Sequence, residues 1–298
     1  MKEYWQEKKK YKPFFQMCLN NSSIKIFTLQ CIRRFNIEVG ANFSDIVITP
    51  YSTKSSMEWI DDLPTFFSEK GMDNRIGVVE TSQNSDELYN RVYEGIKKPK
   101  KEISLNYPNK TIINFLNSPF SIICNLVECG SSKSFSIREK SKKIIRDIMK
   151  KIKIYLGNEI KQGIEVLKLF HLCFDILGQR GSYELVINPI QSIIKTLGYY
   201  KKAMIISVFS KNVRIKYKSF TEKVYADIIR IDHELLMKWN KSNLQHLTAI
   251  QSNLDNLSVT SCIEKLRYRV KKDLEVLSVG KFIFDFSHGI LPTTKIKI

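Results

Sequence analysis

Residues 136–156 read SIREKSKKIIRDIMKKIKIYL, the most regular apolar pattern in the 298-residue chain. Isoleucines recur at positions 137, 144, 148 and 152, and Ile145 widens the same stripe. Apolar residues spaced three, four or seven apart line one face of an α-helix, so this segment predicts an amphipathic helix with buried isoleucines. The other faces carry many lysines and arginines and few acids, which predicts a basic exposed surface.

Helix is also the prediction for most of the chain that follows. Serine or threonine stands at the start of several segments, where its hydroxyl can accept a hydrogen bond from a free amide of the first turn. The predicted helices are residues 111–127, 158–177, 189–197, 221–239, 242–254 and 261–277.

The pattern changes period after residue 198. Residues 203–209 form a continuous apolar run. Apolar and basic residues then alternate in the order Val213, Arg214, Ile215, Lys216, Tyr217, Lys218. Alternation with a period of two is typical of a β-strand. We predict a β-hairpin near residues 203–219, with one buried face and one basic face.

The first hundred residues have a mixed pattern. Three short β-branched runs, residues 24–31, 43–49 and 75–80, predict strands, and residues 85–97 predict a helix that ends before Pro99. The basic segment around Pro99 predicts a boundary between a small α+β part, residues 1–100, and a helical domain, residues 103–298. The expected fold class is therefore mainly α, with a helical C-terminal two-thirds, a small mixed α+β N-terminal part and one basic β-hairpin.

The composition indicates what the chain could bind. The formal net charge is +18, which attracts polyanions or acidic proteins, although abundant lysine, isoleucine and asparagine also result from an AT-rich coding sequence. The six cysteines are scattered, which favours free thiols. No leader and no apolar run long enough to span a bilayer is visible, so we expect a cytoplasmic or nuclear protein without a transmembrane segment.

Catalytic signatures are weak. His233 and Glu234 precede Met237 where a helical zinc-protease motif requires a second histidine, while His171 and His246 lie in apolar contexts typical of structural histidines. We therefore predict no catalytic residues, although an enzyme remains the alternative, because missing motifs exclude only families with local signatures.

Metal and cofactor motifs are also missing from the sequence. Cys124 and Cys129 have the wrong separation for a zinc knuckle, and no phosphate-binding loop or dinucleotide fingerprint is present. We predict no metal and no cofactor.

Nucleic-acid binding has more support. The basic helix and the basic hairpin strand could form a polyanion-binding surface, or two ordinary solvated faces. The candidate residues are Arg138, Lys142, Lys143, Arg146, Lys150, Arg214, Lys216 and Lys218. Residues 178–181, Gly-Gln-Arg-Gly, resemble the GXXG loop of KH domains, but we favour a plain turn between two helices here.

Residues 102–116, EISLNYPNKTIINFL, resemble a segment of the phlebovirus-type nonstructural proteins, NSs. Pro108 and Phe115 match the family pattern, and Tyr107 stands where the family has tryptophan. The resemblance implies a tight turn at these three residues.

The resemblance also implies a function. It implies a non-enzymatic viral nonstructural protein that binds host signalling or transcription proteins, antagonises the interferon response, can self-associate, and acts in the host cytoplasm or nucleus. The alternative is a basic RNA-binding protein of a virus or of an AT-rich genome.

Overall fold

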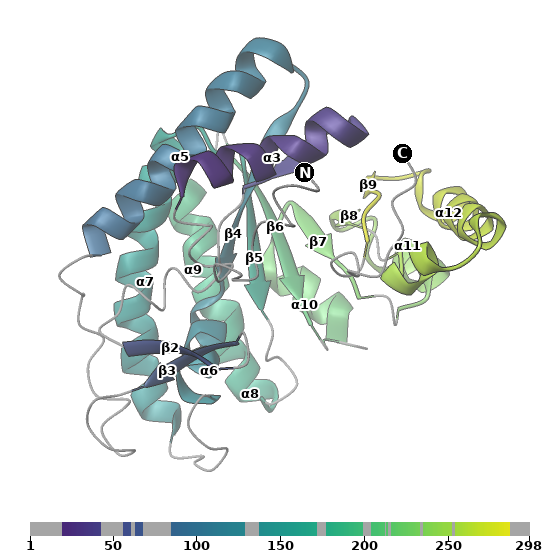
Figure 1. The fold of residues 1–298 in the computed structure, drawn as a ribbon. Coiled ribbons are helices and arrows are strands. Elements are labelled where there is room, and N and C mark those ends of the chain that lie inside the picture. The colour runs from purple at the N-terminus through teal and green to yellow at the C-terminus, as the bar shows by residue number, and fades with distance from the viewer. Residues whose placement is uncertain are drawn as a thin grey trace. The chain divides into compact units, whose positions relative to one another are not determined.

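Seven β-strands form one sheet in the computed structural model (Figure 1). The strands follow the order β1 (Val39–Ala41), β4 (Thr111–Asn117), β5 (Val166–His171), β6 (Ile205–Ser210), β7 (Ile228–Arg230), β8 (Ala249–Gln251) and β9 (Phe282–Ile283). β1 pairs in parallel with β4, β6 with β7, β7 with β8, and β8 with β9. The structure describes residues 20–42, 56–60, 63–67, 85–128, 137–171, 177–198, 204–211, 213, 216–232, 235–251 and 254–286.

The sheet order repeats the order of these strands along the chain, with helices between most of them in sequence. Parallel neighbours cannot be joined by a tight hairpin, and a crossover helix is the usual connection. The fold is therefore a TIM-barrel-like α/β fold, and the prediction of a mainly α protein is wrong.

The chain divides into two compact units, which are described separately. Unit 1 comprises Met1–Lys168 and Thr196–Met204. Its helices are α3 (Asn21–Phe35), α5 (Ser85–Asn106), α6 (Pro119–Glu128) and α7 (Ile137–Lys161), and β2 (Ser56–Ile60) pairs with β3 (Leu63–Phe67) in a separate antiparallel hairpin. Helix α3 crosses α5 (Figure 1), and a Cβ on Gly95 would lie 2.5 Å from Cδ1 of Ile24, so only glycine fits this crossing unchanged.

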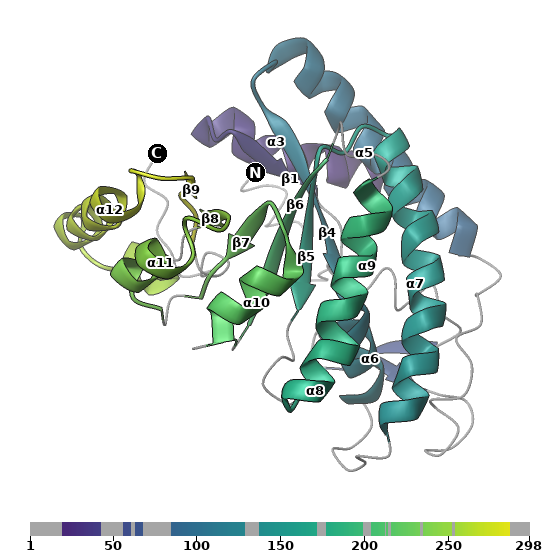
Figure 2. The same cartoon turned by 180° about the vertical axis from the view of Figure 1, so that it is seen from behind.

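Unit 2 comprises Leu169–Lys195 and Ile205–Ile298. Its helical elements are α8 (Gln179–Ser182), a π-turn (Tyr183–Ile187), α9 (Asn188–Leu197, of which Thr196 and Leu197 belong to unit 1), α10 (Tyr217–Val224), α11 (Met237–Asn243), a 3-10 turn (Asn256–Thr260) and α12 (Ile263–Leu277). Helix α10 lies beside the carboxyl end of β6 (Figure 2), where the hydroxyl of Tyr217 donates to the carbonyl of Ser210 at 2.6 Å.

The amphipathic helix predicted from residues 136–156 is confirmed as α7. Ile144, Ile148 and Ile152 are buried, which is what their spacing requires. The helices predicted over residues 189–197 and 261–277 are confirmed as α9 and α12.

The basic hairpin predicted near residues 203–219 is wrong. β6 pairs in parallel with β7, and Tyr217 opens α10. Five of the six residues of β6 are buried, which is typical of a parallel strand covered on both faces. The alternation over residues 213–218 is too short to distinguish a strand from the start of a helix, and Tyr217, Phe220 and Val224 form the buried stripe of α10.

Four predicted helices are only partly helical, and each of them includes a strand. Residues 111–127, 158–177, 221–239 and 242–254 include β4, β5, β7 and β8 respectively. These strands are three to seven residues long. A short apolar run has the same periodicity in a buried strand and in a buried helix, so the sequence could not separate the two.

The predictions for the first hundred residues have different outcomes. Residues 24–31 belong to helix α3, whose first turn is capped by the Asn20 side chain accepting from the Ser23 amide at 3.0 Å, and the predicted strand there is wrong. The runs 43–49 and 75–80 lie outside the described residues. Helix α5 continues through Pro99 to Asn106, so the predicted helix end is also wrong. The predicted domain boundary between residues 1–100 and 103–298 stays a prediction.

A buried polar network joins three elements of unit 1. The side-chain amide of Asn42, directly after β1, donates to Oδ1 of Asn114 on β4 at 2.8 Å, and Asn114 donates in turn to the carboxyl of Glu159 on α7. Tyr155 also hydrogen-bonds to Glu159, and its ring centroid lies 4.9 Å from that of Tyr89 on α5. Burial raises the pKa of Glu159 to about 8, since desolvation penalises the carboxylate more than these hydrogen bonds stabilise it.

This network predicts a pH-dependent stability. The unfolded chain releases the Glu159 proton near pH 4.5, whereas the folded chain holds it up to about pH 8. The stabilisation is therefore complete below the unfolded pKa and decreases as pH rises towards 8, by up to about 1.4 kcal/mol per pH unit. We expect Glu159→Gln to remove this contribution in denaturant titrations at pH 5, 6, 7, 8 and 9.

Glu165→Gln serves as the control, because the pKa of Glu165 is lowered by its contacts with Lys100 and Thr111 despite partial burial. An unchanged pH slope in Glu159→Gln would show that the network does not hold a proton.

Candidate active site

Polar side chains in unit 2 stand where the parallel strands end. His171 ends β5, Ser210 ends β6, Arg230 ends β7 and Gln251 ends β8, and Asp285 comes two residues after β9. In (β/α) folds with parallel strands, catalytic and binding groups gather at the carboxyl ends of the strands. We therefore expect a functional site at this edge of the sheet.

The register of the sheet aligns three of these positions. Phe209 of β6 pairs with Arg230 of β7, which pairs with Gln251 of β8. Side chains that are in register on parallel strands point to the same face of the sheet. The guanidinium carbon of Arg230 lies 5.2 Å from the ring centroid of Phe209, and Phe170 of β5 meets the same ring edge-on, with centroids 5.8 Å apart. An aromatic wall thus borders a cation.

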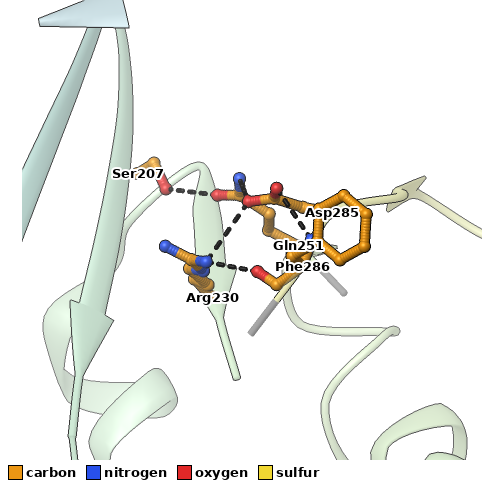
Figure 3. Close-up of polar contacts among 5 residues, drawn as sticks. All are labelled: Ser207, Arg230, Gln251, Asp285 and Phe286. Carbon is orange, nitrogen blue, oxygen red and sulfur yellow. Dashed lines mark hydrogen bonds and ion pairs between the residues drawn. The ribbon is translucent and has the colours of Figure 1, made fainter. Parts of the chain in front are cut away.

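Hydrogen bonds connect the row to neighbouring residues (Figure 3). Ser207 Oγ donates to Gln251 Oε1 at 3.2 Å, and Gln251 Nε2 donates to Asp285 Oδ2 at 2.6 Å. The amide of Phe286 donates to Asp285 Oδ1 at 2.8 Å. Both carboxylate oxygens of Asp285 thus already accept bonds. We call Ser207, Phe209, Arg230, Gln251 and Asp285 the strand-end cluster.

Arg230 is the charged centre of the strand-end cluster. Its Nη2 donates to the backbone carbonyl of Phe286 and lies 3.5 Å from Asp285 Oδ2. Burial lowers the pKa of Arg230, while the nearby charges of Asp285, Tyr217 and Asp232 oppose that shift. An arginine side chain stays protonated even when it is buried, so the cluster holds a largely desolvated cation. Such a cation attracts carboxylates and phosphates more strongly than one in water does.

Sequence reasoning missed Arg230, Gln251 and Asp285. It placed Arg230 in a predicted helix over residues 221–239, where a charged side chain has no special meaning. The available signal was the run Ile228-Ile229-Arg230-Ile231-Asp232, in which two charged residues alternate with isoleucines that are buried. Such alternation is typical of a short strand, and it could have placed Arg230 at a strand end.

The residues singled out by the NSs resemblance lie in unit 1, outside the strand-end cluster. Tyr107 and Pro108 occupy the turn between α5 and β4, where the Lys110 amide donates to the Tyr107 carbonyl at 2.9 Å. Phe115 lies within β4.

The candidate polyanion-binding residues divide between the units. Five lie on α7 in unit 1, namely Arg138, Lys142, Lys143, Arg146 and Lys150. Arg146 and Lys150 are exposed, and Lys150 Nζ pairs with Asp147 at 3.2 Å. Lys216 precedes α10 and Lys218 lies in its first turn, both in unit 2, while Arg214 lies outside the described residues. A polyanion-binding surface from these residues stays a prediction.

The remaining candidates from the sequence are placed as follows. Gly178 precedes α8, and Arg180 pairs with Glu184 at 3.1 Å within the following turns, so the GXXG match is the start of a helix. His171 is buried at a strand end and His246 is exposed after α11, which differs from the helical positions predicted for both. His233 and His288 lie outside the described residues. Within the described part of the chain, no three histidine, cysteine or acidic side chains converge as a metal site, and no helix could cross a bilayer.

Comparisons with known structures agree with the fold. A methyltransferase from Methanosarcina mazei superposes with a TM-score of 0.76 at 12% identity, covering 95% of this chain and 84% of that one. A B12-independent methionine synthase from Shewanella sp. W3-18-1 superposes with a TM-score of 0.58 at 14% identity, covering 91% of this chain and 81% of that one. At these identities the likeness supports the α/β fold alone.

Sequence comparisons identify relatives over nearly the whole chain. The uroporphyrinogen decarboxylase of Rickettsia bellii is 28% identical over 304 residues, which cover 99% of this chain and 87% of that protein. The uroporphyrinogen decarboxylase of Rickettsia canadensis is 26% identical over 308 residues, with 99% and 88% covered.

These matches correct the functional predictions. The relation to phlebovirus-type NSs is wrong, and with it the interferon antagonist, the host signalling or transcription partners, and the location in a host cytoplasm or nucleus. The alternative of a basic RNA-binding protein is also wrong. So is the prediction of a non-enzyme, because the relatives are named for a decarboxylase.

One match spans the sequence from end to end. The model of the family described as uroporphyrinogen decarboxylase (URO-D) matches residues 1–297 of the 298-residue chain. The match includes all the elements of both units, strand-end cluster included. The chain belongs to the uroporphyrinogen decarboxylase family.

Proposed function

We propose that this protein decarboxylates uroporphyrinogen. The observation that carries the proposal is the family match over residues 1–297. Support comes from relatives of that name, which the chain matches over 85% to 88% of their length. The α/β fold is one in which catalytic groups characteristically lie at strand ends.

Decarboxylation sets definite chemical requirements. The bond between a carbon and a carboxylate breaks, carbon dioxide leaves, and the carbon takes up a proton. A protein that promotes this step must orient the departing carboxylate, keep water from competing, and stabilise the charge that develops. Uroporphyrinogen is a tetrapyrrole with several carboxylate side chains, so cations near an apolar surface suit it.

The strand-end cluster offers these features. Phe170 and Phe209 provide an apolar wall beside the guanidinium of Arg230. Gln251 is fixed at both ends of its amide by Ser207 and Asp285, so its side chain is held in one orientation. A group held by prior hydrogen bonds needs no rearrangement when a ligand arrives.

The net charge of +18 also suits a polycarboxylate substrate. A positive potential raises the local concentration of an anionic ligand and speeds its encounter with the protein. This accounts for the excess of lysine without nucleic acid as a partner.

Turnover is the direct test of the proposed function. The purified full chain, incubated with uroporphyrinogen under reducing conditions, should release carbon dioxide and form tetrapyrroles that have lost carboxyl groups, as measured by chromatography and mass spectrometry. A heat-inactivated sample gives the background rate. Failure to turn over the substrate above this background would contradict the proposal.

Salt should weaken the encounter with the substrate. Raising the ionic strength from about 0.01 M to about 0.15 M shortens the screening length from about 30 Å to about 8 Å. We therefore expect KM for uroporphyrinogen to rise several-fold while kcat changes little. Sucrose at matched osmolality adds no ions and should leave KM unchanged. A KM that does not respond to salt would remove the surface charge from the account of substrate capture.

A further inference from the structure

Arg230 is buried, but its hydrogen bonds to the described residues use only part of its guanidinium group. Its residue is 9% exposed, yet both of its polar contacts are made by Nη2, and Nε has no hydrogen-bond partner among the described residues. A guanidinium has five N–H donors, and a buried donor without an acceptor destabilises the folded state. The structure thus holds donors in place that the described chain does not use.

The contact with Asp285 does not provide the acceptor that the buried donors of Arg230 lack. The 3.5 Å between Arg230 Nη2 and Asp285 Oδ2 exceeds the roughly 2.7–2.9 Å of a charge-assisted hydrogen bond. Gln251 and the Phe286 amide already bind the two oxygens of Asp285. Elsewhere in the chain, Lys100 Nζ lies 2.7 Å from Glu165, so this protein also forms close ion pairs.

The aromatic neighbours restrain the guanidinium. The cation lies over the ring of Phe209, which is itself in edge-on contact with Phe170. Such contacts limit the orientations of the guanidinium plane and keep water from one of its faces. A planar, restrained guanidinium with unused donors has the form that carboxylates bind in a forked arrangement.

We propose that Arg230 is the receptor for one carboxylate of the tetrapyrrole, which binds to the guanidinium donors that Phe286 and Asp285 leave unoccupied. The inference rests on the proposed function and assigns a substrate-binding residue to it. Gln251 and Asp285 then act as positioning residues. Their mutual hydrogen bond holds Asp285 beside Arg230 and leaves the remaining N–H donors of Arg230 unbound.

The rival explanation is a purely structural arginine that holds the Phe286 carbonyl beside the end of β7. In that case replacement lowers stability and leaves ligand affinity unchanged. In the proposal, affinity for the carboxylated tetrapyrrole falls more than stability can explain.

The experiment titrates the full chain with uroporphyrin, the oxidised and fluorescent form that keeps the carboxylates, and measures Kd, together with KM and kcat for uroporphyrinogen and the thermal midpoint. Arg230→Gln should weaken uroporphyrin binding about 10- to 100-fold, the range for lost hydrogen bonds to a charged group. Arg230→Lys keeps the charge but lacks the fork, so an intermediate loss is expected.

Arg269→Gln is the matched control. Arg269 on α12 lies 3.5 Å from Asp273, so its replacement breaks an ion pair of the same length outside the strand-end cluster. Its Kd should stay within about twofold of the original, since it lies outside the proposed receptor. A similar weakening in this control would mean that lost stability, and not the receptor, explains the effect.

The outcomes separate the inference from the function on which it rests. If Arg230→Gln binds uroporphyrin as well as the original chain, the inference is overturned, whatever the turnover. If Arg230→Gln does not fold, the Kd of Arg230→Lys decides, and an unchanged value overturns the inference. Binding that depends on Arg230 without turnover would sink the proposed function and leave the receptor standing. No binding by the original chain would sink both.

Discussion

The parallel register of β6, β7 and β8 is the constraint on which the candidate site depends. Phe209, Arg230 and Gln251 are far apart in the sequence, and only this pairing places them side by side. A slip of one residue in β7 would turn Arg230 to the opposite face and bring Ile229 into the row. Ile229 is fully buried, so such a slip would put the charged Arg230 into an apolar position on the opposite face, which opposes it.

A buried cation makes this arrangement costly for stability, which is why the cluster indicates function. Replacing a buried ion pair by apolar residues often leaves stability unchanged or raises it, so stability alone gives little reason to keep Arg230 in its place. The neighbouring Ile229 and Ile231 are buried, so apolar side chains are accommodated next to Arg230. The Glu159 network of unit 1 is a different case, since its carboxyl is held by neutral partners and keeps its proton, which avoids a buried charge.

The sequence predicted the long helices α7 and α12 and missed the short strands. The isoleucine stripe of α7 extends over several turns, so its period is unambiguous. β7 and β8 are three residues each, and a run of three residues has no measurable period. Arg230 and Gln251 lie in those strands, so the cluster could not be inferred until the sheet order was known. The basic alternation over residues 213–218 suggested a hairpin for the same reason, since it is shorter than two turns of helix.

A crystal structure of the full chain with uroporphyrin bound tests most directly whether the tetrapyrrole binds at the strand ends through the guanidinium of Arg230. We expect a carboxylate oxygen within about 3 Å of Nε or Nη1 of Arg230. A tetrapyrrole bound elsewhere, with those donors still unoccupied, would contradict this expectation.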